Sequence, residues 1–312
     1  METLLYTLLD YLKDIPYDIS DIVFDKMDFI TQIRFRQNND FMYENIQMQN
    51  FYDIPDSIRD KLNDDILKKY SCITKLNAHN NTQIISVSHL APLRELDASS
   101  DCGIDQSEIR ELRHLVKLNA SNNTRITNVN HLTCLRVLSA AGNCGIYQNG
   151  ISELRHIVKL NACNNIYITN VNHLTSLCEL DISGYCRVDQ TGICELRHLV
   201  KLDAWNNSGI TNVNHLVDLC ELDAGGYCGI DREGICELRH LVKLDACKNT
   251  LLTNMYHIRG LCELNKTGVS RLTTDHHMYM CQLMHILKLN MFSHDKSSRE
   301  IQPVYKYRLF KN

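Results

Sequence analysis

The sequence has little proline and tryptophan, and it lacks the segments that identify membrane-spanning or secreted proteins. Among 312 residues there are only 4 prolines and 1 tryptophan. No apolar run approaches the roughly 20 residues that a helix needs to cross a bilayer, and the N-terminus lacks the basic start and cleavage site of a secretory signal. The net charge of -4, from 33 basic and 37 acidic side chains, is too balanced to indicate binding to nucleic acid or to an anionic membrane.

Motifs of catalysis and metal binding are also missing from the sequence. It contains no G-x-S-x-G, no phosphate-binding glycine loop, no H-E-x-x-H and no C-x-x-C. We therefore expect a protein that is not an enzyme and that needs no cofactor. The 14 cysteines could indicate disulfides, but the repeat described below gives them a packing role instead. We therefore expect a reducing compartment and place the protein in the cytoplasm.

A repeated segment of 42 residues dominates what is present. ELRHLVKLNASNNTRITNVNHL (111–132) returns as ELRHIVKLNACNNIYITNVNHL from residue 153 and as ELRHLVKLDAWNNSGITNVNHL from residue 195. Each repeat contains two coils, because aligned leucines follow one another in alternating steps of 20 and 22 residues. One coil cannot bury its own leucines, so the coils must stack. The aligned leucines are Leu76, Leu96, Leu118, Leu138, Leu160, Leu180, Leu202, Leu222, Leu244 and Leu264.

This pattern resembles that of leucine-rich-repeat proteins over about residues 70–290. The resemblance implies an α/β solenoid in which the short L-x-L/A segments are parallel strands of a concave sheet. We expect a small all-α N-terminal region over residues 1–60 and a solenoid of about ten or eleven coils over residues 61–292, the last at Leu289. Residues 293–312 are expected to form a C-terminal cap or tail.

Two sets of repeated polar or reactive residues have a structural interpretation. One asparagine recurs at an equivalent position of each odd coil, and we expect it to be buried and to bind backbone groups of the turn. One cysteine recurs every 42 residues, two coils or roughly 10 Å apart, which is too far for a disulfide or a shared zinc ion. We therefore expect these cysteines to pack as small apolar residues. The asparagines are Asn81, Asn123, Asn165, Asn207 and Asn249, and the cysteines are Cys102, Cys144, Cys186 and Cys228.

The residues on either side of each aligned leucine should be exposed on the concave face. Those before it alternate between lysine and glutamate, which predicts cross-strand pairs that fix the register. Those after it include four successive acids, Asp181, Asp203, Asp223 and Asp245, which repel one another and indicate a basic partner or compensation by the flanking lysines. Trp205 should face outward beside them, either as an interface anchor or as a cover over small neighbours. We take these five residues as the candidate binding patch.

A second resemblance concerns residues 14–37, DIPYDISDIVFDKMDFITQIRFRQ. Their apolar spacing is similar to that of an F-box, whose core resembles L-P-x-x-I-x-x-x-I-F-x-x-L. In that family the segment docks the adaptor Skp1, and the repeats select a target for ubiquitin ligation. The residues that the resemblance assigns to the adaptor are Ile15, Pro16, Ile19, Ile22, Phe24 and Met27.

The F-box-like segment ahead of repeats, together with frequent Asn, Ile and Tyr, resembles the F-box/leucine-rich-repeat proteins encoded by giant DNA viruses of amoebae. The resemblance implies a substrate-recognition subunit of an SCF-type ubiquitin ligase, in the host cytoplasm if the protein is viral. The alternative is a non-enzymatic binding or scaffold protein whose N-terminal helices only cap the solenoid. Both are protein-binding functions, and they differ in whether a Skp1-like adaptor is bound.

Overall fold

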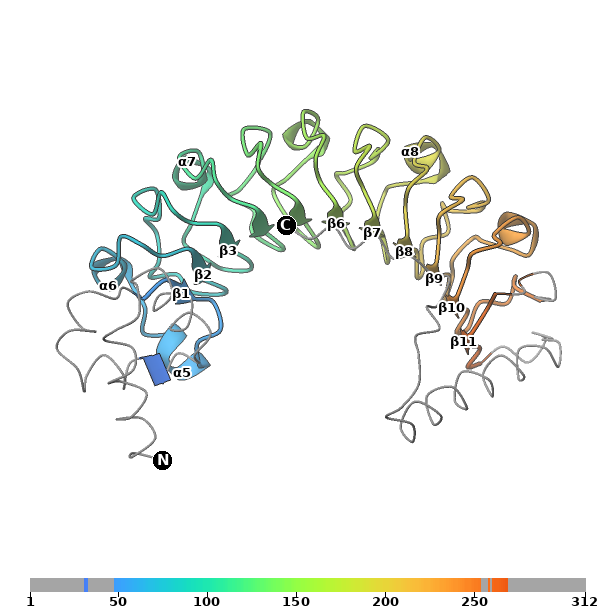
Figure 1. Cartoon of the computed structure of the whole chain (residues 1–312), viewed down its shortest axis with the longest axis horizontal. Helices are drawn as coiled ribbons and strands as arrows, with labels where there is room; N and C mark the ends of the chain where they lie inside the picture. The colour runs from blue at the N-terminus through green and yellow to red at the C-terminus, as the bar shows by residue number, and fades with distance from the viewer. Residues whose placement is uncertain (1–30, 33–47, 254–257, 259, 269–312) are drawn as a thin grey trace, which may run out of the picture.

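The computed structural model describes residues 31–32, 48–253, 258 and 260–268. In this part of the chain eleven strands follow one another in sequence order and form one parallel sheet along the concave side of a curved solenoid (Figure 1). The predicted leucine-rich-repeat solenoid is confirmed. The strands are β1 (Asn50–Phe51), β2 (Lys75–Asn77), β3 (Glu95–Asp97), β4 (Lys117–Asn119), β5 (Val137–Ser139), β6 (Lys159–Asn161), β7 (Glu179–Asp181), β8 (Lys201–Asp203), β9 (Glu221–Asp223), β10 (Lys243–Asp245) and β11 (Glu263–Asn265).

The aligned leucines lie at the centres of β2 to β11, and each pairs with the leucine of the next strand. Leu118 is in register with Leu138, which is in register with Leu160. These side chains point into a continuous apolar interior, which also holds the isoleucines, valines and leucines of the loops and of the convex side. Because the coils share this interior, each coil is stabilised by its neighbours rather than by itself.

The sheet begins earlier than expected, within residues assigned from the sequence to a helical region. Phe51 of β1 is in register with Leu76 and is buried, so it occupies the place of an aligned leucine. The helices that follow, α5 (Asp56–Arg59) and α6 (Asp64–Leu67), are single turns. Residues 1–30 and 33–47, with the F-box resemblance, lie outside the described residues, as do Leu289 and residues 293–312.

The convex side carries a short helix on every second coil (Figure 1). Asp105 and Asp189 cap two of these helices, since their carboxylates accept backbone N–H groups of the first turn. These hydrogen bonds lower the pKa of both carboxyls, the largest contribution coming from the hydroxyls of Ser107 and Thr191. Four of the convex helices lie in the coils of 22 residues: α7 (Gln106–Ile109), η1 (Gln148–Gly150), α8 (Gln190–Ile193) and η2 (Glu233–Ile235).

The recurring asparagine is buried and binds backbone groups of its turn, as predicted, and the structure shows that it also joins two coils. Asn165 Nδ2 donates to the carbonyl oxygens of Ala140 (2.6 Å) and Ile146 (3.5 Å) of the preceding coil. Its Oδ1 accepts the backbone N–H groups of Tyr167 (2.8 Å) and Ile168 (3.1 Å) of its own turn. The same side chain thus forms hydrogen bonds with backbone groups on both sides of a coil boundary. Without it, these buried backbone groups would have no partner.

A second row of asparagines, directly before the first, was not recognised from the sequence. Asn164 and Asn206 have positive φ angles of 55° and 58°, and their Oδ1 atoms accept the backbone N–H groups of Tyr185 (3.0 Å) and Tyr227 (2.9 Å). The next coil has glycine beside each tyrosine, and a Cβ at Gly184 would collide with the Asn164 amide. Of the two adjacent asparagines, the second therefore binds backbone groups inside the solenoid, and the first binds the backbone of the turn in the next coil.

The recurring cysteines pack in the interior of the coils that lack the buried asparagine. Cys102 Sγ accepts the backbone N–H of Ile104 at 3.5 Å, and Cys144 Sγ accepts that of Ile146 at 3.4 Å. Burial raises the pKa of both thiols to about 11, so they are neutral near pH 7. This agrees with the predicted packing role.

Candidate protein-binding surface

The residues before the aligned leucines form ion pairs across the concave sheet, as their alternating charges predict. Lys75 Nζ lies 3.0 Å from Glu95 Oε1, Lys159 Nζ lies 2.7 Å from Glu179 Oε1, and Lys201 Nζ lies 3.5 Å from Glu221 Oε2. These side chains are partly exposed, so each pair contributes roughly 0–1 kcal/mol. These lysine–glutamate pairs fix the register of the strands, and their charges largely cancel. The net charge of the concave face therefore depends on the neighbouring column of residues.

The residues after the aligned leucines, the Asx column, are almost all Asp or Asn. Each of these side chains accepts the backbone N–H two residues later, as Asn161 Oδ1 does from Cys163 (2.9 Å) and Asp203 Oδ1 from Trp205 (3.0 Å). This bond turns the chain out of the strand. Since Asn119 makes the same bond to Ser121 at 3.1 Å, the turn requires the oxygen and not the negative charge.

Four carboxylates nevertheless follow one another in the Asx column, on β7 to β10. Asp181 is in register with Asp203, Asp203 with Asp223, and Asp223 with Asp245, at a strand spacing of about 4.8 Å. Burial raises the pKa of Asp223 to about 6, and the carboxylates of Asp203 and Asp245 add to the shift. The pKa of Asp203 is also raised, chiefly by burial and further by Asp181. Like charges are thus held together at the expense of stability.

Trp205 lies beside this acidic stripe, immediately beyond the end of β8. Its indole packs over the next coil, where a Cβ at Gly225 would come within 2.7 Å of Trp205 Cδ1. The residue is still 42% exposed. Trp205 therefore covers a glycine pair, as one interpretation predicts, and it also presents an aromatic surface to solvent. Its role as an interface anchor stays a prediction.

Two exposed tyrosines flank Trp205 on the neighbouring coils and were not recognised from the sequence. Tyr185 is 87% exposed and Tyr227 is 85% exposed, although both are large and partly apolar. Their backbone N–H groups donate to Asn164 and Asn206, which fixes the backbone of both residues. The equivalent residues of earlier coils, Asp101 and Asn143, are not aromatic. The two tyrosines could have been found by aligning LDISGYC and LDAGGYC with the other coils, since only these two coils have tyrosine at that position.

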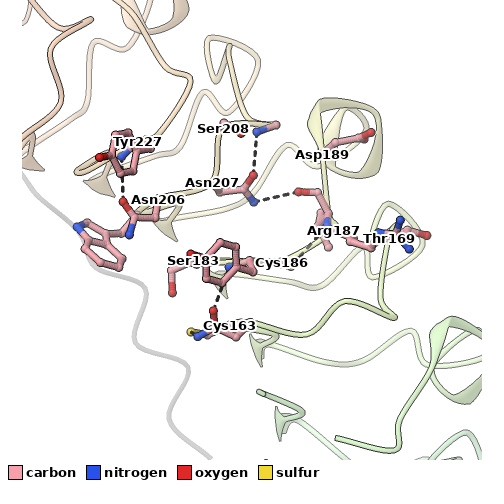
Figure 2. Close-up of a pocket in the computed structure, with 16 residues that line it drawn as sticks. Cys163, Thr169, Ser183, Cys186, Arg187, Asp189, Asn206, Asn207, Ser208 and Tyr227 are labelled. Atoms are coloured by element: carbon pink, nitrogen blue, oxygen red, sulfur yellow. Dashed lines mark hydrogen bonds between the residues drawn. The ribbon is translucent and has the colours of Figure 1, made fainter. Parts of the chain in front are cut away.

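An open depression of 670 Å³ runs along this edge of the solenoid, and Trp205, Tyr185 and Tyr227 contribute to its lining. Figure 2 shows Cys163, Ser183 and Asn206 around it, on three successive coils. The depression adjoins the acidic stripe, because Asp181 Oδ1 accepts the N–H of Ser183 at 3.0 Å. Burial raises the pKa of the Cys163 thiol, and the charges of Asp181 and Asp203 raise it further.

We call the combined surface the acid–aromatic patch. It brings together all five concave residues selected from the sequence and adds the two tyrosines. The six F-box residues lie outside the described residues, so Ile15, Pro16, Ile19, Ile22, Phe24 and Met27 have no structural assignment. The members of the patch are Asp181, Asp203, Asp223, Asp245, Tyr185, Trp205 and Tyr227.

The described residues contain neither a membrane-spanning helix nor a cluster of metal-binding side chains. No helix in that part of the chain has the length and apolar character to span a bilayer. No three or more His, Cys, Asp or Glu side chains in it are arranged to hold a metal ion.

No protein-family model and no curated protein match the chain. Solved structures that resemble it include internalins of Listeria monocytogenes. The functional domain of InlJ, which includes a cysteine ladder, is 17% identical over 68% of this chain and 48% of that domain, with a TM-score of 0.49, so the chain spans about half the length of the InlJ domain. InlF is 19% identical over 66% of this chain and 70% of that one, with a TM-score of 0.47. Internalin C2 is 16% identical over 64% and 72%, with a TM-score of 0.32.

Proposed function

We propose that this chain is a non-enzymatic protein-binding solenoid that serves as the substrate-recognition subunit of an SCF-type ubiquitin ligase. Residues 14–37 bind a Skp1-like adaptor, and the acid–aromatic patch binds the target protein. The protein acts in the cytoplasm, that of the host if it is viral. The observation that carries the binding function is the run of four carboxylates beside exposed aromatic rings.

The carboxylates support a binding role because folding does not require them. Asparagine fills the same column at Asn119 and Asn161 and makes the same turn. A charge that raises the energy of the fold, at a position where a neutral isostere serves, indicates a use outside folding. Exposed Trp and Tyr side chains are the residues most enriched among interface anchors, and solenoids use their extended concave surfaces for binding.

The adaptor-binding role rests on the F-box resemblance of residues 14–37. Replacing Ile19, Phe24 and Met27 together by Asp should abolish capture of Skp1 in a pull-down with the full chain, because burying three unpaired charges in an apolar interface is costly. Circular dichroism checks that the solenoid stays folded, and Asp203→Asn serves as the control that should leave capture unchanged. Equal capture by the triple variant, or no capture by the wild type, contradicts the ligase role.

The alternative is a free-standing scaffold protein whose N-terminal segment closes the end of the stack. One observation favours it: β1 joins the sheet directly, and Phe51 and Leu67 are buried against the first coils. An N-terminal cap is a structural requirement of solenoids. Under this alternative the wild type binds a target through the acid–aromatic patch and does not bind Skp1.

A further inference from the structure

We propose that the acid–aromatic patch recognises an extended, arginine-containing segment of the partner protein. The arginine side chains lie between the carboxylates of β7 to β10 and the rings of Tyr185, Trp205 and Tyr227. This inference rests on the proposed binding function and specifies the chemistry of the ligand. It combines an exposed aromatic depression with a charge that only a cationic partner complements.

The carboxylates have acceptor capacity to spare. Within the described residues, hydrogen bonds reach Oδ1 of Asp203 and Asp223, from Trp205 and Gly225, and none reaches their Oδ2 atoms. Asp97, on β3, differs because its Oδ2 accepts Asn119 Nδ2 at 3.0 Å. Lys201, in the neighbouring column, is paired with Glu221 at 3.5 Å, and its charge also acts on the Asp203 carboxylate. The Oδ2 atoms of Asp203 and Asp223 therefore remain as acceptors for an incoming cation.

The aromatic rings select arginine among cations. A guanidinium binds a carboxylate through a planar fork and also stacks on aromatic faces, whereas an ammonium does only the first as a point charge. Trp205, Tyr185 and Tyr227 provide such faces within one or two coils of Asp203. Arg187 is a cation in the lining of the depression. In Figure 2 Arg187 is drawn on the side of Asp189, and Tyr227 is drawn on the opposite side of the depression.

The spacing of the patch favours an extended segment with arginine at every third position. Equivalent residues of alternate coils, such as Asp181 and Asp223 or Tyr185 and Tyr227, are separated by two strand spacings, about 10 Å. In a polyproline II segment, residues three apart lie on one side and are about 9 Å apart. A partner segment running along the solenoid axis would thus present one arginine to every second coil.

The test uses the full chain and a labelled peptide, RPSRPSRPS, with its arginines at that spacing. Since Trp205 is the only tryptophan, its fluorescence reports binding at the patch, and anisotropy of the label gives the affinity. We expect binding that weakens as salt rises. The peptide EPSEPSEPS should not bind, and KPSKPSKPS should bind roughly tenfold more weakly.

The variants follow substitutions that the repeats already contain, so that folding is retained. D203N with D223N should weaken peptide binding by about tenfold or more, and Trp205→Ser, the residue at Ser121, by about tenfold in anisotropy. D97N is the matched control and should bind as the wild type does. The inference is overturned if the arginine peptide leaves Trp205 fluorescence unchanged, or if D203N with D223N binds it as D97N does.

The Skp1 pull-down separates this inference from the proposed function. Capture of Skp1 with no arginine preference leaves the ligase role standing and removes the ligand assignment. Arginine-peptide binding without Skp1 capture supports the ligand assignment and removes the ligase role.

Discussion

At the scale of single residues, equivalent positions of different coils carry either Asp or Asn, so the effect of the negative charge can be compared within one protein. The Asx column contains both Asn and Asp, and both make the turn after the strand. Asp97 and Asp245 each accept a side-chain hydrogen bond from an asparagine on the next strand, at 3.0 and 2.8 Å. Asp203 and Asp223 have carboxylates on both sides instead, and so they carry the electrostatic strain of the column.

Replacing Asp223 by Asn should stabilise the protein at neutral pH. The pKa of Asp223 is about 6 in the folded state and 3.8 for the ordinary carboxyl. Because the folded pKa is raised, the protonated form stabilises the fold below pH 4, and this contribution is lost as the pH rises through 6. At this half-buried site, solvent screening reduces the gain at pH 7.5 to about 1 kcal/mol. Urea unfolding at pH 4 and pH 7.5 measures it.

Asp97→Asn is the control for that prediction. Its second oxygen accepts the Asn119 amide, so an amide at residue 97 loses a hydrogen bond and should give no gain at pH 7.5. The same stabilisation for Asp97→Asn, or a gain for Asp223→Asn that is as large at pH 4 as at pH 7.5, would show that the ionised, half-buried carboxylate of Asp223 is not its source.

At the scale of elements, the convex helices approach the preceding coil through glycine. The N–H of Val171 donates to the carbonyl oxygen of Gly192 in α8 at 2.9 Å. In α7 the equivalent residue is Glu108, and its Oε2 accepts the N–H of Val87 at 2.8 Å. Burial would raise the pKa of Glu108, but the N–H groups of Ser88 and Val87 lower it overall. The valine N–H of the preceding coil is thus bound by a backbone oxygen in one repeat and by a side-chain oxygen in another.

Replacing Gly192 by Ala should destabilise the protein by roughly 1–3 kcal/mol. A Cβ there would collide with the carbonyl oxygen of Thr169, which is backbone and is fixed by its own coil. Gly260 is the matched control, because a Cβ at that position meets its nearest atoms at an ordinary 3.5 Å. Midpoints of chemical unfolding compare the two variants, and a Gly192→Ala midpoint equal to that of Gly260→Ala would contradict the close contact.

At the scale of the whole molecule, the solenoid is a line of coils that contact only their neighbours. Each strand of the sheet pairs with the strands of the coils directly before and after it. Stability in such an array is the sum of coil energies and of interfaces between neighbours. A defect in the middle should therefore act locally before it acts globally.

Leu160→Ala tests this at the centre of the sheet. Leu160 on β6 is buried, and its truncation should destabilise by about 2–5 kcal/mol. Hydrogen exchange followed by mass spectrometry should show faster exchange over residues 138–180 than over residues 76–96 or 222–244. Leu264→Ala, in the partly buried β11, should leave the central coils unchanged. Equal acceleration along the whole chain would show one cooperative unit instead.

The positions of β2 to β11 were predictable because a solenoid makes spatial neighbours from residues one coil apart. The 20- and 22-residue steps therefore predict the register, the buried asparagines and the lysine–glutamate pairs directly. β1 escaped prediction because Phe51 satisfies the same interior without the leucine pattern or the asparagine turn. Burial depends on volume and polarity, and so a phenylalanine can fill a leucine position without any repeat in the sequence.

The sequence by itself determined the stacking, and with it the run of four carboxylates, since both depend only on residue type at a fixed period. The tertiary structure decided which exposed side chains share one surface. Tyr185 and Tyr227 lie beside Trp205 because asparagines of the coils before them hold their backbones, and because glycines leave room for those amides and for the indole. These are contacts between coils, and the direction of a side chain across such a boundary depends on packing that a repeat period does not contain.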